Sequence, residues 1–176
     1  MGLKKIVVVQ FKLNETYYLS EETFRSKIER VLALADSKIK LGEDTIVVFP
    51  ENIGSFLVFL GEKNIVKTAN SLQVALRKMV RDNYSLLLKI WVKARRWIAF
   101  LKVKKSKEML NTYISVFSRL AKIYKTNIVV RTILIPEVHK LGSKITLTGY
   151  KVYNTCFVFN TKGRVAGIQQ KEFSVL

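Results

Sequence analysis

Residues 44–55, DTIVVFPENIGS, determine how the rest of the chain is interpreted. The run TIVVF at 45–49 is apolar and β-branched, which predicts a strand buried on both faces. Pro50 has no N–H to donate to a sheet, so the strand is expected to end there. Glu51 then lies just past the carboxyl end of a strand, where α/β sheets bind their ligands.

Glu51 has two interpretations. A carboxylate that is partly desolvated at this position would have a raised pKa and could act as a base near neutral pH. Alternatively, Glu51 is a solvated acid in a loop or beside a helix N-cap. The stretch alone leaves both readings open, because acids at strand ends mark functional sites only statistically.

The composition is that of a folded domain with an unusual charge. The chain has 176 residues, 49% of them hydrophobic, which is enough for one domain with a core. The single cysteine, Cys156, excludes an internal disulfide and favours a reducing compartment. The sequence shows neither an uncharged transmembrane run nor a signal-peptide cleavage pattern. We therefore expect a cytoplasmic protein.

The net charge of +18 is concentrated in one segment. Residues 77–107, from Arg77 to Lys107, contain eleven lysines and arginines and one acid, Asp82. Within it, residues 84–103 predict a basic amphipathic helix with two tryptophans. The favoured reading is that its apolar side packs on the domain. The alternative is peripheral binding to an anionic membrane, with nucleic acid the less favoured partner.

Hydrophobic periodicity predicts alternating strands and helices in a single α/β domain covering residues 1–176. Ser20 predicts a helix cap, and Ser106 predicts a second one. His139 falls in an expected polar loop at 139–149 and is expected to be exposed. The predicted strands are 5–11 (a central strand), 45–49, 127–136 and 152–160, with a hairpin partner at 164–171, and the predicted helices are 20–41, 64–81, 84–103 and 106–124.

Four pieces then occur in one order: a first strand with Gln10, FPEN at 49–52, IPE at 135–137, and YNTCFVFNTKGRVAGIQQKE at 153–172. This series resembles the N-terminal part of the nitrilase superfamily, the carbon–nitrogen hydrolases. The resemblance implies part of an αββα sandwich, in which two sheets face each other with helices outside. Residues of about 68–106 would be a basic helical insertion. The inner apolar face of the sheet would be exposed.

The resemblance also implies a catalytic set of Glu, Lys and Cys. Glu51 matches the general base that takes the thiol proton, and Lys171 matches the cation that stabilises the oxyanion. The nucleophilic Cys would lie beyond this sequence, and Cys156, inside a strand, is expected to be an inert small hydrophobe. The implied substrate is a small amide, nitrile or carbamoyl compound, with no cofactor and no metal.

Because the sequence stops five residues after Lys171, we expect a truncated or split member, inactive alone. A homo-oligomer or a complementing C-terminal chain would complete it. Two alternatives stay open: an inactive remnant that acts in binding or assembly, and a basic module that binds anionic membrane or nucleic acid.

Overall fold

The computed structural model describes residues 2, 4–10, 12–82, 95–142 and 144–172. Part of the predicted helix at 84–103 therefore lies outside the described residues. The strands are β1 (Lys5–Val8), β2 (Thr45–Phe49), β3 (Asn127–Leu141), β4 (Lys144–Phe159) and β5 (Val165–Glu172), and the helices are α1 (Glu21–Ile39), α2 (Lys63–Lys67), α3 (Leu72–Asp82) and α4 (Arg95–Ile123), with 3₁₀ helices at Glu15–Tyr18 and Ser55–Phe59.

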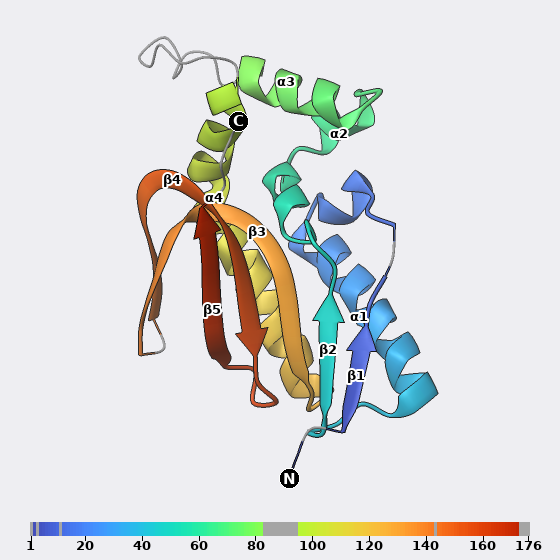
Figure 1. The fold of residues 1–176 in the computed structure, drawn as a ribbon. Coiled ribbons are helices and arrows are strands. Elements are labelled where there is room, and N and C mark those ends of the chain that lie inside the picture. Colours follow the sequence, from blue (N-terminus) through green and yellow to red (C-terminus); the bar gives the residue numbers. More distant parts are fainter. Residues whose placement is uncertain (1, 3, 11, 83–94, 143, 173–176) are drawn as a thin grey trace.

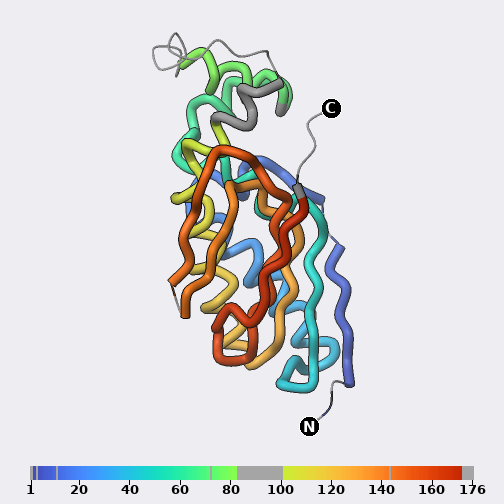
Figure 2. The backbone as a smooth tube through the Cα atoms, turned by 60° about the vertical axis from the view of Figure 1, so that its left-hand side comes forward, coloured from blue at the N-terminus to red at the C-terminus, as the bar shows by residue number. Residues whose placement is uncertain are grey.

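The strands form one sheet in the order β1-β2-β3-β4-β5. The first two pairings are parallel and the last two antiparallel, which confirms the predicted hairpin partner at 164–171. Strands β2 and β5 consequently run in the same direction, and both arrows point toward the end of the sheet where α2 and α3 lie (Figure 1). The turned view of Figure 2 shows the same arrangement, with α2 and α3 beyond the strand ends.

Helices α1 and α4 cover one face of the sheet through a cluster of aromatic rings. Phe117 of α4 lies 5.9 Å from Phe24 of α1, 5.3 Å from Phe49 of β2 and 6.0 Å from Phe159 of β4, measured between ring centroids. All four side chains are fully buried. Since alternate strand residues point to opposite faces, this packing also fixes which residues lie on the other face.

That second face, here called the open face, is covered by neither α1 nor α4 (Figure 1). Ile6 and Val8 of β1 are 67% and 75% exposed on it. The prediction that residues 5–11 form a central strand is wrong, since β1 lies at the sheet edge. A β-branched run indicates a strand but carries no information about its place in the sheet.

The open face also corrects the prediction for β2. Thr45, Val47 and Phe49 are buried against the helices, but Ile46 and Val48 are only partly buried. The uninterrupted apolar run was expected to mean burial on both faces. Among the described residues, only one face of β2 has a layer packed upon it. This side of the sheet is therefore exposed in the described part of the chain, and its identity as the inner face of a sandwich stays a prediction.

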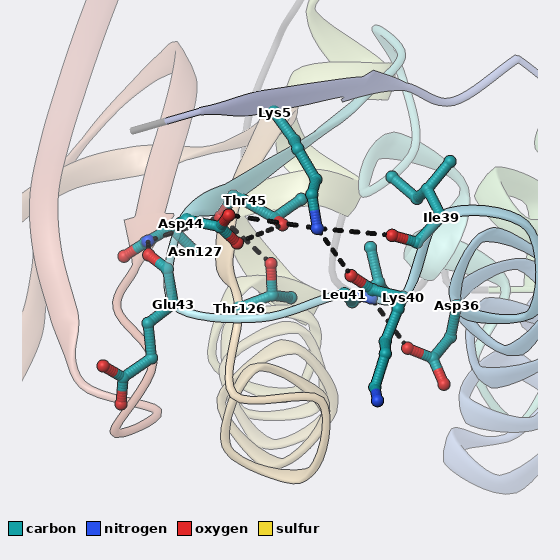
Figure 3. A network of polar contacts seen from close by, with 10 residues as sticks. All are labelled: Lys5, Asp36, Ile39, Lys40, Leu41, Glu43, Asp44, Thr45, Thr126 and Asn127. Atoms are coloured by element: carbon teal, nitrogen blue, oxygen red, sulfur yellow. Dashed lines mark hydrogen bonds and ion pairs between the residues drawn. The ribbon is translucent and has the colours of Figure 1, made fainter. Parts of the chain in front are cut away.

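A polar network holds the amino end of the parallel strands to the end of α1 (Figure 3). Lys5 Nζ donates to the carbonyl oxygens of Ile39 and Lys40 at 3.3 and 3.1 Å, and lies 3.9 Å from Asp44. Thr126 Oγ1 donates to the carbonyl oxygen of Thr45 at 3.0 Å, and both residues are buried. A cation at the helix carboxyl terminus also complements the helix dipole.

Three predicted helix features can be compared with the structure. The Ser20 cap is confirmed, because its hydroxyl accepts from the Thr23 backbone at 3.1 Å in a capping box. The Ser106 cap is wrong, because Ser106 lies inside α4 and its hydroxyl donates to the Val103 carbonyl at 2.7 Å. Ser commonly bonds back to the preceding turn in this way. The predicted helix at 64–81 is divided into α2 and α3, where the Ser71 hydroxyl accepts from the Val74 backbone.

The polar loop expected at 139–149 is instead the end of a long hairpin. Strands β3 and β4 continue pairing as far as Leu141 and Lys144, with Gly142 in the turn at φ +61°. Polar side chains are compatible with a solvent-exposed hairpin, so composition did not distinguish it from a loop. His139 is exposed, as expected, with Nε2 3.7 Å from Glu137.

The end of this hairpin borders an open cavity of about 640 Å³ together with α4 and the β4–β5 turn. Lys140 Nζ closes one side by donating to the Val165 carbonyl at 2.5 Å. The cavity lies where β5 begins, at the opposite end from Glu51. None of the helices in the described part of the chain combines the length and apolar character needed to cross a bilayer.

Candidate active site

Glu51 follows β2 directly, in the first turn after Pro50. Its side chain is 58% exposed. The sequence predicted that this carboxylate could be partly desolvated. It is instead exposed to water, because among the described residues no layer covers the open face here. The position at the carboxyl end of a parallel strand is as expected.

The carboxylate of Glu51 is paired with Arg131 of β3. Arg131 Nη2 donates to Glu51 Oε1 at 2.6 Å, which is both a hydrogen bond and an ion pair. Phe49 is in register with Val130, so Arg131 is the next residue along the neighbouring strand and points to the open face. A charge-assisted bond of this length fixes the direction of both side chains.

The two backbone segments that carry this pair are joined to each other. The Gly54 N–H donates to the Thr132 carbonyl at 3.1 Å. Asn52 and Thr132, each next to a member of the pair, have φ of +63° and +42°. A positive φ is unusual for a β-branched residue and persists only where surrounding contacts enforce it. Here Thr132 lies in a register shift of β3.

A glycine is needed at position 54 because the backbone comes so close to its neighbours. A Cβ atom there would lie 2.7 Å from Ile133 Cβ and 2.7 Å from the Tyr113 ring. The Tyr113 hydroxyl in turn bonds the Val130 carbonyl on the same strand. Helix α4 therefore supports the segment that carries Arg131.

Lys171 lies at the same end of the sheet as Glu51. It is an exposed residue near the carboxyl end of β5, in register with Asn154 of β4. Phe157 and Phe159 of β4 face the helices, so by alternation Asn154 and Lys171 lie on the open face. Two residues 120 positions apart in the sequence thus occupy one end and one face of one sheet.

Cys156 lies on the same face, between these two residues in strand order. It is opposite Gln169 on one side and the register shift of β3 on the other. Burial raises the pKa of its thiol, while the positive charge of Arg131 acts in the opposite direction. The raised pKa disfavours the thiolate, which supports the expectation that Cys156 is not a nucleophile.

Metal ligands were not expected from the sequence. Within the described ranges, no three His, Cys, Asp or Glu side chains are grouped closely enough to hold a metal ion.

The geometry can be compared with known proteins. No protein-family model and no curated protein matches the sequence. Among solved structures, a crystal structure of a carbon–nitrogen hydrolase from Helicobacter pylori G27 is similar, with a TM-score of 0.50 and 14% sequence identity. The similarity covers 94% of this chain and 38% of that chain.

The chain has the fold of part of a carbon–nitrogen hydrolase. This confirms the fold class that the sequence motifs implied, an α/β layer from a larger sandwich. The chain spans 38% of the length of that hydrolase. The roles of Glu51 and Lys171 stay predictions, because a structural similarity at 14% sequence identity shows the fold alone.

Arg131 is the site residue that the sequence reading missed. The segment NIVVR at 127–131 was read only as a strand. The available signal was a charged residue directly after the apolar run of a predicted strand, which places it near Glu51 only if that strand pairs with β2. Which strand neighbours β2 could not be read from the sequence.

Proposed function

We propose that this chain contributes Glu51 and Lys171 to a carbon–nitrogen hydrolase that acts on an amide, nitrile or carbamoyl bond. The nucleophilic thiol would come from polypeptide outside these 176 residues. The observation that carries the proposal is that Glu51 and Lys171 lie at the same end and on the same face of a hydrolase-type sheet.

For an amide, the chemistry assigns one step to each group. Glu51 accepts the proton of the thiol, and the thiolate attacks the carbonyl carbon. Lys171 stabilises the negative charge that develops on the carbonyl oxygen. Glu51 then returns the proton to the leaving nitrogen, ammonia or an amine departs, and a thioester is left. Water hydrolyses the thioester to the carboxylic acid and regenerates the thiol.

The open face is where the completing polypeptide would pack. Ile6 and Val8 expose large apolar surfaces there, and exposed apolar patches mark interaction sites. A layer on this face would also remove water from Glu51, which is 58% exposed without it. We favour a complementing C-terminal segment over a second copy, because the chain matches only 38% of a hydrolase chain.

The ion pair between Arg131 and Glu51 favours a second candidate, an inactive form that acts in binding or assembly. One oxygen of the Glu51 carboxylate is already occupied by the 2.6 Å bond from Arg131, so this side chain has a partner within the chain itself. In that case Glu51 would have a structural role, and amide hydrolysis would not depend on it.

The basic segment supports a third candidate less well. Of its described cations, Lys105 pairs with Glu62 at 2.8 Å and Lys78 donates to the Thr68 carbonyl at 2.7 Å. These two serve the fold itself. Membrane or nucleic-acid binding through residues 77–107 stays a prediction, to be tested by its dependence on salt.

The test of the proposed function is ammonia release from amides, nitriles and carbamoyl compounds by the complete natural gene product. Glu51→Gln and Lys171→Ala are each expected to lower kcat by about a hundredfold or more. Glu43→Gln and Lys162→Ala, which change exposed residues at the other end of the sheet, are the matched controls. Full activity in both site variants would refute the proposal and leave the second candidate.

A further inference from the structure

Arg131 has a position suited to a ligand as well as to Glu51. It lies on the open face in strand order between Glu51 and Cys156, and it is 54% exposed. A guanidinium group presents five N–H donors in a planar fork. Among the described residues, this fork donates one hydrogen bond, from Nη2 to Glu51 Oε1.

The surroundings hold this arginine in place before any ligand arrives. Glu51 fixes one edge of the fork at 2.6 Å. The backbone of β3 is held at Val130 by Tyr113 and at Thr132 by Gly54, on either side of Arg131. A cation whose side chain is already positioned loses little conformational entropy when it binds an anion.

A structural role alone does not account for this arrangement. Ion pairs between exposed groups contribute little to stability, about 1 kcal/mol or less. Yet Arg131 is followed by Thr132, a β-branched residue at φ +42°. This backbone conformation costs free energy and is typical of functional sites.

The charge at this end of the open face favours an anionic ligand. Arg131 and Lys171 are cations and Glu51 is an acid, so these three groups sum to one positive charge. A planar carboxylate matches the guanidinium fork through two parallel hydrogen bonds. A neutral amide offers no group of that charge.

We propose that Arg131 binds a carboxylate of the substrate, so that the preferred substrates are small molecules with both an amide or nitrile and a carboxylate group. This inference rests on the proposed function and assigns the substrate class of the same site. Arg131 is then a specificity residue, which Glu51 positions.

The first test measures binding without catalysis. Succinamate, which has an amide and a carboxylate, is compared with butyramide, its neutral analogue of similar length, by calorimetric titration of the complete natural gene product. Arg131→Leu is expected to weaken succinamate binding by about tenfold or more, because the loss of a hydrogen bond to a charged group lowers affinity by about that factor. Butyramide binding is expected to stay weak and unchanged.

The matched control is Arg164→Leu, an exposed arginine in the β4–β5 turn at the other end of the sheet. Arg131→Lys keeps the charge but loses the fork, so it is expected to restore only part of the affinity. Absence of succinamate binding, or equal binding by the wild type and Arg131→Leu, would overturn the inference.

The second test separates the inference from the proposed function. In ammonia-release assays, Arg131→Leu is expected to lower the ratio of kcat/KM for succinamate to kcat/KM for butyramide about tenfold, whatever its effect on the two rates separately. One outcome would refute the inference alone. In it, hydrolysis depends on Glu51 and Lys171, but Arg131→Leu and the wild type prefer the same substrates. Arg131-dependent binding without any Glu51-dependent hydrolysis would refute the proposed function alone.

Discussion

The hydroxyl group of Tyr113 donates a hydrogen bond of 2.9 Å to the carbonyl oxygen of Val130, and both residues are fully buried. Burial also raises the pKa of this tyrosine well above its ordinary value, so the hydroxyl stays a donor. Through this bond, the long helix α4 supports the strand segment that carries Arg131.

Tyr113→Phe is therefore expected to lower the free energy of unfolding by about 1–3 kcal/mol, because the carbonyl of Val130 is left buried without a partner. Urea unfolding followed by circular dichroism measures the loss. Tyr150→Phe is the control, since Tyr150 is 87% exposed. An equal loss in both variants would contradict the assigned role.

Gly54→Ala is expected to destabilise the protein by about 1–3 kcal/mol, the usual cost of overpacking a filled space. The added methyl group would lie 2.7 Å from Ile133 Cβ and from the Tyr113 ring. Gly42→Ala is the control, because its Cβ would lie 3.5 Å from Asp44, an ordinary contact. Thermal unfolding of the two variants side by side checks the prediction.

The pair of Glu51 and Arg131 is expected to matter for function more than for stability. A double-mutant cycle with Glu51→Gln and Arg131→Leu is expected to give a coupling free energy of about 0.2–1 kcal/mol, as for other exposed pairs. The coupling is expected to fall as salt increases. A coupling several times larger would mean that the pair is a structural element of the fold.

Lys102 of α4 predicts a pH dependence of stability. Burial lowers its pKa to about 8 from its ordinary value of 10.5. Between these values the unfolded state binds more protons than the folded state, so unfolding free energy rises as pH increases from about 8 to 10.5. Below pH 8 the charge on this largely buried lysine costs on the order of 3 kcal/mol.

Lys102→Met is accordingly expected to stabilise the protein most below pH 8, with the advantage shrinking toward pH 10.5. Denaturant unfolding of wild type and variant across this range measures the difference. Lys107→Met, at an exposed position of the same helix, is the control. A difference that does not change with pH would show that Lys102 keeps an ordinary pKa.

The open face predicts an effect on association. Replacing Ile6 and Val8 together by lysine is expected to reduce self-association or binding of a completing segment, with little change in stability, because both are exposed. Leu34→Lys, at a 59% exposed position on α1, is the control. Sedimentation velocity distinguishes the variants, and unchanged association would contradict the role of this face.

The sequence predicted those elements whose signals are local. The Ser20 cap, the strand before Pro50 and the hairpin that pairs β5 with β4 all follow from residues within a short stretch of sequence. The prediction failed where the answer depended on a distant neighbour. The edge position of β1, the one-sided burial of Ile46 and Val48, and the contact between Arg131 and Glu51 are set by which elements pack together.

The order of the strands also has a consequence for how the chain reaches this structure. Strands β3, β4 and β5 follow one another with short turns, and α4 directly precedes them. Strands β2 and β3, in contrast, pair across the whole span from Phe49 to Asn127. Contacts of low sequence separation close faster than distant ones. We therefore expect the C-terminal meander to form before β2 pairs with β3, so that the contact between Glu51 and Arg131 forms after it.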